Sequence, residues 1–246
     1  MTKKVLFNVI KEYPEMIQII VYKQPLNVPE RLSNARKQPK EGIDDYLTLE
    51  RSVRRSRAVI RDLVVCNKFE LFCTFTFDPR KYDRYNFKNL KLVMLRWLNN
   101  QRRSTSPNLQ YLVIPEFHKD GAIHFHALLK NYHGYIKKTN KRSRKGNNEV
   151  FNLPSFRGGF TTASYIDDNL EAVAQYVSKY ITKDLIQIFN QNRYFCSKHL
   201  IRPKLYNNRI FWLPKIKDAK QIYATRYYET YLLKNNVDNK KQLHIY

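Results

Sequence analysis

The segment from residue 111 to 130, YLVIPEFHKDGAIHFHALLK, is predicted to form two strands joined by a tight turn. Residues 119–121 (KDG) supply the turn, because Asp-Gly readily adopts the positive φ values of a hairpin. His124 and His126 are two residues apart on the return strand, so both imidazoles point from the same face. Pairing around the turn brings Glu116 near them. Two imidazoles and one carboxylate are typical of a catalytic metal site that leaves other positions of the cation open.

The same pattern also has an ordinary interpretation, because a His-x-His pair can simply form a polar strand face. The charge of the chain favours a functional interpretation. Lys and Arg number 45 against 21 Asp and Glu, giving a formal net charge of +24. Such an excess points to a polyanionic partner, and the 18 Tyr and 14 Phe suit stacking on unpaired bases. Aromatic cores and solvated charged faces remain the alternative explanation.

The cysteine content and the apolar segments indicate where the protein acts. The three cysteines include no C-x-x-C, so neither a disulfide framework nor a cysteine zinc site is expected. No apolar stretch approaches transmembrane length, and the N-terminus lacks the features of a signal peptide. We therefore expect a protein of a reducing cytoplasm with no membrane partner.

The pattern along the chain predicts one compact α+β domain. Its expected parts are strands at 5–10 and 16–22, a connecting segment at 25–42, helices at 44–66 and 87–103, a strand at 69–77, a basic loop or hairpin tip at 131–148, a short strand within 156–162, and helices at 167–184 and 219–234. The helix at 44–66 carries arginines at positions 51, 54, 55, 57 and 61. This arginine face is either solvent-exposed or contacts phosphates, and the sequence leaves both open.

The helix predicted at 167–184 is the second informative element. Tyr176 and Tyr180 are four residues apart, so their phenols lie one above the other on one face. Lys179 and Lys183 repeat with the same spacing beside them. The pair could be half-buried tyrosines flanked by surface lysines. It could also supply two nucleophiles, whose high phenol pKa, near ~10, would need a neighbouring cation or metal to favour the phenolate.

Three motifs in fixed order, FCTFTFDP, IHFHALL and YVSKYITK, resemble those of rolling-circle replication initiators of the HUH endonuclease superfamily. The sequence His124-Phe125-His126 matches the His-hydrophobic-His motif. Residues 176–180, YVSKY, match the two-tyrosine form found in initiators of small single-stranded DNA phages. The resemblance covers roughly residues 69–204, and residues 1–68 and 205–246 are left as an N-terminal segment of unassigned role and a C-terminal extension. The resemblance implies a central antiparallel sheet of about five strands, flanked by helices.

The resemblance also implies roles for individual residues. Glu116, His124 and His126 would hold one Mg²⁺ or Mn²⁺ ion. Tyr176 would be the first nucleophile and Tyr180 its partner, although Tyr180 also begins a Y-x-x-K with Lys183. Lys179 would neutralise phosphate charge or handle a proton. The residues expected to contact DNA are Thr74, Thr76, Asp78, Arg54, Arg55, Lys198 and Arg202. His118 shares the face of Glu116 but ranks below it as a ligand, and Asp78 could reach the metal.

The activity so implied is nicking of single-stranded origin DNA through a tyrosine, with later rejoining of the strand, in the cytoplasm of a bacterial host. It leaves a 5′-phosphotyrosine and a free 3′-OH that a polymerase can extend. The sequence has no G-x-x-x-x-G-K-[ST] loop, so a host helicase would be needed alongside a host polymerase. The alternatives are a non-catalytic single-stranded nucleic-acid-binding protein and an HUH transposase with the same chemistry.

Overall fold

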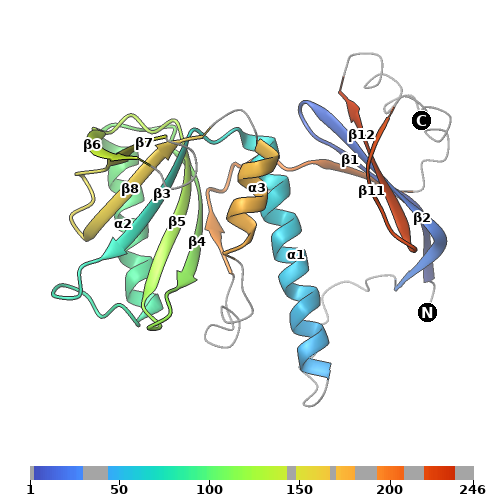
Figure 1. Ribbon diagram of the computed structural model, residues 1–246, viewed down its shortest axis with the longest axis horizontal. Helices are drawn as coiled ribbons and strands as arrows, with labels where there is room; N and C mark the ends of the chain where they lie inside the picture. Colours follow the sequence, from blue (N-terminus) through green and yellow to red (C-terminus); the bar gives the residue numbers. More distant parts are fainter. Residues whose placement is uncertain are drawn as a thin grey trace. The chain divides into compact units, whose positions relative to one another are not determined.

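The computed structural model describes residues 3–29, 44–142, 148–166, 170–180, 193–207 and 219–235. The chain divides into two units, each built around its own antiparallel sheet (Figure 1). One unit joins residues 1–40 to residues 202–246, and the other comprises residues 41–201. The single compact domain predicted from the sequence is therefore wrong. The boundaries also differ, because the two ends of the chain pair with each other and residues 44–67 belong to the larger unit.

The smaller unit is a five-stranded sheet with the order β10-β1-β2-β12-β11. Its strands are β1 (Lys3–Glu12), β2 (Met16–Pro29), β10 (Lys204–Asn207), β11 (Lys220–Ala224) and β12 (Tyr228–Lys234). The strands predicted at 5–10 and 16–22 are confirmed and pair with each other, although β2 continues to Pro29, into the segment expected to be a connection. Its core is formed by Ile10, Ile17, Ile19 and Leu233.

The helix predicted at 219–234 is wrong, because these residues form the β11–β12 hairpin. The segment is rich in tyrosine and also contains isoleucine and threonine, which fit the pleated surface of a sheet better than a helix. Its pairing with β2 decides the outcome: residues 228–234 align with residues 16–22 in register. That partner is distant in sequence, so helical periodicity within the segment was a poor guide.

The larger unit has a seven-stranded antiparallel sheet with the order β6-β7-β8-β3-β5-β4-β9. Its elements are α1 (Asp44–Asn67), β3 (Leu71–Phe77), α2 (Phe87–Ser104), β4 (Gln110–Phe117), β5 (Ile123–Lys130), β6 (Lys137–Arg142), β7 (Glu149–Asn152), β8 (Gly159–Tyr165), α3 (Leu170–Ser178) and β9 (Phe195–Cys196). The α+β class is confirmed. The sheet has more strands than the expected five, since β6 and β7 form a hairpin from the basic segment and β9 adds an edge.

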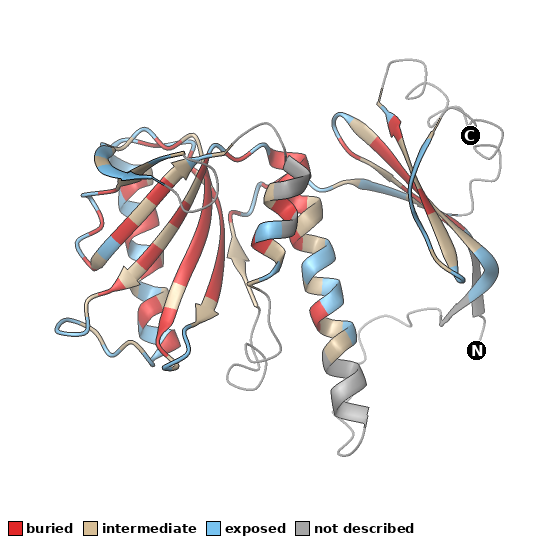
Figure 2. Cartoon of the chain, viewed as in Figure 1, coloured by how far each residue is buried: buried red, intermediate tan, exposed pale blue. Residues whose placement is uncertain are grey.

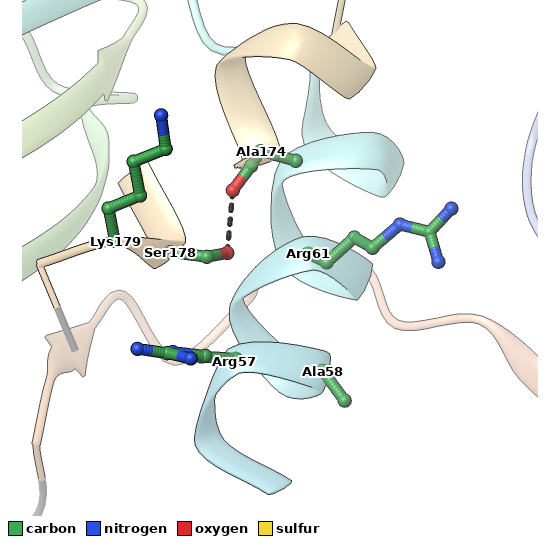
Figure 3. A pocket seen from close by; sticks show the side chains of 6 residues that line it. All are labelled: Arg57, Ala58, Arg61, Ala174, Ser178 and Lys179. Carbon is green, nitrogen blue, oxygen red and sulfur yellow. Dashed lines mark hydrogen bonds between the residues drawn. The ribbon is translucent and has the colours of Figure 1, made fainter. Parts of the chain in front are cut away.

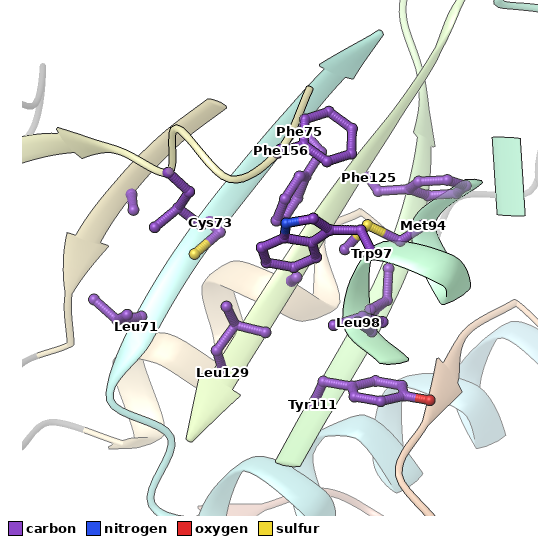
Figure 4. Packing of buried hydrophobic residues seen from close by; sticks show 14 of the residues in the cluster. Leu71, Cys73, Phe75, Met94, Trp97, Leu98, Tyr111, Phe125, Leu129 and Phe156 are labelled. Atoms are coloured by element: carbon purple, nitrogen blue, oxygen red, sulfur yellow. The ribbon is translucent and has the colours of Figure 1, made fainter. Parts of the chain in front are cut away.

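One face of this sheet packs against α2 through large apolar side chains (Figures 2 and 4). Alternate residues of β3, including Phe75 and Phe77, are fully buried there, as is Phe125 of β5. Trp97 of α2 lies 5.0 Å from the Phe75 ring, measured between ring centroids. This period-two burial follows from strand geometry, in which successive side chains point to opposite faces.

The other face packs against α1 and α3. Its apolar cluster includes Ile60 and Val64 of α1, Val177 of α3, and Leu112 and Leu128 of the sheet. The helix predicted at 44–66 is thus confirmed, and α3 occupies part of the helix predicted at 167–184. Residues 181–184 lie outside the described part. In the residues that the structure describes, no helix is long and apolar enough to cross a membrane.

Candidate active site

The predicted hairpin at 111–130 is confirmed, and its register places the candidate residues together. Glu116 of β4 pairs directly with His124 of β5. Gly121 has φ +83°, the left-handed conformation that favours glycine in a tight turn. The turn is closed by two backbone hydrogen bonds, in which Gly121 N donates to the His118 carbonyl and His118 N donates to the Ala122 carbonyl, each at 2.8 Å. The turn chemistry therefore sets which carboxylate faces the histidines.

Strand β3 contacts both imidazoles at Nδ1 and so helps to orient them. Thr74 pairs with His126 and Thr76 pairs with His124 in the β3–β5 register. In each pair the threonine Oγ1 lies 3.1 Å from the histidine Nδ1. A hydroxyl that accepts the Nδ1 proton directs the Nε2 lone pair outward, and such outer contacts fix the tautomer and orientation of a metal-binding histidine. Thr74 and Thr76 therefore contact the histidines, and their predicted place in a DNA-binding surface stays a prediction.

The carboxylate of Glu116 lies beside the Nε2 edge of His126, with 2.5 Å between Oε2 and Nε2. His126 is 6% exposed, so this contact occurs in a largely buried setting. The ring of His118 stacks on His124 with centroids 5.3 Å apart, and its Nδ1 lies 3.5 Å from a carboxylate oxygen of Asp120. Glu116, rather than His118, contacts the His126 imidazole.

Tyr180 follows α3 and covers the ring of His126. Its ring stacks on His126 with centroids 3.6 Å apart and planes inclined by 18°. Its hydroxyl donates a hydrogen bond of 2.7 Å to the hydroxyl of Tyr176. Both phenols are therefore adjacent to each other and beside the face of the sheet that carries His126.

Phe72 is a site residue that the sequence analysis missed. Its ring centroid lies 5.5 Å from Tyr176, 6.4 Å from Tyr180 and 5.6 Å from His126. A signal for it was present, because Phe72 precedes Thr74 by two residues and so shares its face of β3. This ring packs between the sheet and the tyrosines and so helps to hold the phenols over the histidines.

Burial shifts the acidity of two of these groups. Burial raises the pKa of the Tyr180 phenol well above its usual value, and the hydrogen bond to Tyr176 raises it further. Burial lowers the pKa of His124, and the neighbouring His118 and His126 lower it further. Both effects favour the neutral form of His124, the form in which an imidazole can bind a cation.

The donor set suits a divalent cation, because two imidazoles with Nδ1 held by hydroxyls and one carboxylate on the next strand are typical ligands. Within the described ranges, however, no group of three or more His, Cys, Asp or Glu side chains is already arranged around one point. The Glu116–His126 contact brings only one predicted histidine ligand into contact with the carboxylate. The metal site remains a prediction.

Lys179 is exposed and lines a pocket of about 450 Å³ between α1 and α3 (Figure 3). Arg57 and Arg61 line the α1 side of this pocket, which places three cationic residues around it. Ser178, on the α3 side, donates a hydrogen bond of 2.6 Å to the carbonyl of Ala174, one turn earlier in the helix. Lys183, the other predicted lysine, lies outside the described residues.

The remaining predicted DNA contacts are dispersed. Arg54 and Arg55 are exposed on α1, and Arg54 lies 3.8 Å from Glu50. Lys198 is exposed in the larger unit, whereas Arg202 begins the C-terminal part of the smaller unit. The structure does not test their roles.

Asp78 is engaged locally at the end of β3. Its carboxylate accepts hydrogen bonds of 3.0 Å from the Arg80 backbone and 2.9–3.0 Å from the Arg80 guanidinium. These bonds lower the pKa of Asp78 to about 2. The carboxylate thus stabilises the turn after β3.

Comparison with known proteins covers part of the larger unit. Residues 70–185 match the model of a family described as replication-associated protein. The match includes β3, the histidine hairpin and α3, and excludes α1 and the smaller unit. Searches of curated proteins and of solved structures gave no significant match. Over residues 70–185 the chain is therefore similar to this family of replication-associated proteins, which indicates a replication-associated function and interaction with DNA.

Proposed function

We propose that this protein nicks single-stranded DNA at a replication origin through a tyrosine and later rejoins the strand, as a two-tyrosine HUH initiator. One observation carries the proposal. The hydroxyls of Tyr176 and Tyr180 lie 2.7 Å apart, and the Tyr180 ring stacks directly on His126, whose Nε2 contacts Glu116. Two potential nucleophiles thus adjoin the predicted ligand set, on the face of the sheet opposite α2.

The proposed reaction breaks one phosphorus–oxygen bond for each one that it forms. A tyrosine oxygen attacks the scissile phosphorus as its proton leaves, and the bond from phosphorus to the 3′-oxygen breaks. The 3′-oxygen keeps the electron pair and takes up a proton, leaving a free 3′-OH and a 5′-phosphotyrosine. The reverse attack of a 3′-OH restores the DNA bond and releases the tyrosine. Rejoining therefore needs no ATP.

The contacts between the tyrosines support Tyr176 as the first nucleophile. Tyr176 is 42% exposed, which leaves its hydroxyl accessible to a phosphate. Tyr180 donates its hydroxyl hydrogen to the Tyr176 oxygen, so the Tyr180 proton is engaged in this bond. The raised pKa of Tyr180 keeps that phenol protonated as a donor. Tyr180 would act in the second cleavage, after the first link has formed.

Glu116, His124 and His126 would hold a Mg²⁺ or Mn²⁺ ion. The bound ion would polarise the scissile phosphate and offset its negative charge in the transition state. Thr74 and Thr76 would keep the imidazoles in the ligating orientation. Lys179, with Arg57 and Arg61 across the pocket, would attract the DNA backbone next to the tyrosine helix.

The test is a covalent-adduct assay. Labelled single-stranded oligonucleotides that tile a candidate origin are mixed with the protein and Mn²⁺ and run on denaturing gels. We expect a shifted covalent band that disappears in EDTA and in the double variant Tyr176→Phe, Tyr180→Phe. Single variants would rank the tyrosines, with Tyr176→Phe losing the initial adduct. Tyr135→Phe is the matched control, because Tyr135 is 69% exposed and lies outside the site.

A contrary result would favour the binding-module alternative. If no oligonucleotide forms an adduct while salt-sensitive binding persists in EDTA and in His124→Ala, the histidines have no catalytic role. An adduct that forms equally well in EDTA would remove the cation from the mechanism. A transposase would form the same adduct, but on element ends rather than on an origin.

A further inference from the structure

The smaller unit carries a cluster of tyrosines outside the segment that matches the replication-associated family. Tyr22 of β2 and Tyr228 of β12 face each other across the strands, with ring centroids 6.4 Å apart. Tyr223 of β11 lies 5.8 Å from Tyr228 by the same measure. Tyr223 is 53% exposed and Tyr227, which immediately precedes β12, is 60% exposed. Tyr22 and Tyr228 are half-buried, and Tyr228 supports the exposed ring of Tyr223.

The turn of the β11–β12 hairpin is rigidly built. The Thr225 hydroxyl accepts hydrogen bonds of 3.1 Å from the backbone N–H groups of Tyr227 and Tyr228. The Thr225 backbone N–H also donates to the Tyr228 carbonyl at 2.9 Å. Tyr227 and Arg226 are therefore held at the tip. The Arg226 guanidinium carbon lies 4.6 Å from the centroid of the Tyr227 ring, in cation–π geometry.

The charge of the smaller unit is complementary to a polyanion. Its described residues include nine Lys and Arg against three Glu. One of those carboxylates, Glu229, lies 3.2 Å from the Lys23 ammonium and accepts a hydrogen bond from Tyr231, so the negative charge near the tyrosines is largely offset. Exposed aromatic rings amid net positive charge favour unpaired bases, whose faces stack while their phosphates meet the cations.

We propose that Tyr22, Tyr223, Tyr227, Tyr228 and Arg226 form a stacking platform for single-stranded DNA, here called the tyrosine platform. It goes beyond the proposed nicking reaction and does not depend on it. Tyr223 and Tyr227 contact the bases, Arg226 contacts a phosphate or extends the stack, and Tyr228 supports the Tyr223 ring. Binding at this surface is tolerant of sequence, because every base offers a π-face.

The test measures equilibrium binding of a fluorescein-labelled oligothymidylate of about 16 nucleotides by anisotropy, a length that matches the site sizes of such surfaces. The full-length chain carries Tyr176→Phe and Tyr180→Phe, and EDTA is present, so that cleavage plays no part. We expect Tyr223→Ala with Tyr227→Ala to weaken binding by about ten-fold or more. Tyr223→Phe with Tyr227→Phe should bind nearly as the parent, because phenylalanine keeps the stacking face. Tyr135→Ala, which removes an exposed tyrosine of the larger unit, should leave binding unchanged.

Two further readouts keep the proposal falsifiable. Should the double alanine variant fail to fold, Arg226→Ala tests the same tip without altering the sheet, and a several-fold loss of binding is expected. Unchanged binding in the folded double alanine variant, or in Arg226→Ala where that variant replaces it, overturns the proposal. If the alanine variant instead changes the oligomeric state in sedimentation while oligothymidylate binding persists, the surface joins copies of this chain. Adduct formation on origin DNA is scored separately, so the nicking reaction and the platform can fail independently.

Discussion

The two faces of the seven-stranded sheet differ in what they contribute. The face against α2 is filled by buried aromatic rings, with Phe75, Phe77 and Phe125 each 0–1% exposed. The opposite face carries threonine, histidine and glutamate side chains that contact one another by polar bonds. Adjacent residues such as Thr74 and Phe75 thus belong to different environments. The comparison teaches that a well-packed face can hold the strands rigid while the other face positions polar groups for chemistry.

Phe75→Ala is expected to produce the largest effect on stability. The ring is fully buried and lies 5.0 Å from both Trp97 and Phe156 between centroids, so its removal leaves a cavity. The free energy of unfolding should fall by about 3–5 kcal/mol. Denaturant titration measures this, with Phe160→Ala as control, because Phe160 is 51% exposed on β8. Equal losses in the two variants would contradict the assignment of the core to the α2 face.

Thr74→Val tests the polar face one residue away. The change removes the hydroxyl that contacts Nδ1 of His126 while keeping the side-chain volume. Cation-dependent adduct formation should fall about 10–100-fold, as for other outer contacts of metal ligands. Stability should fall by about 1–3 kcal/mol, because a buried ring nitrogen loses its partner. Thr74→Ser should retain activity, and a Thr74→Val protein with full activity would show that the hydroxyl does not orient the histidine.

Arg57→Ala with Arg61→Ala tests the pocket beside the tyrosine helix. Both residues line the α1 side of that pocket, so their removal should weaken single-stranded DNA binding at low salt. The slope of log affinity against log salt should become shallower by up to about 1.4, if each arginine meets one phosphate. Lys88→Ala with Arg96→Ala removes the same charge from exposed positions of α2. Equal losses of DNA binding in both double variants would mean that the affinity depends on the net charge of the protein and not on this pocket.

Lys138→Ala is expected to have the smallest effect. Lys138 pairs with Glu149 across the β6–β7 hairpin, but the two side chains are 64% and 50% exposed. An ion pair open to solvent contributes little, so the free energy of unfolding should change by less than about 0.5 kcal/mol. A loss above ~1 kcal/mol in denaturant titration would show that this hairpin contributes to the rigidity of the sheet.

The candidate site was predictable where its geometry is local. The turn at 119–121 and the two-residue spacing of His124 and His126 determined that Glu116 would pair with the histidine strand. Phe72 was missed although the same period-two reasoning reaches it. The stacking of Tyr180 on His126 could not be derived from spacing, because it depends on how α3 packs on the sheet.

The sequence by itself determined the hairpin register, the alternation of β3 and the excess of positive charge, since each depends on neighbouring residues or on composition. Only the tertiary structure decided that residues 219–234 form strands, that the ends of the chain share one sheet, and that Tyr180 stacks on His126. The physical reason is that these outcomes require burial against partners far away in the chain. Residues 16–22 give β12 its pairing partner, and α1 supplies much of the apolar surface on which Ala174 and Val177 of α3 are buried.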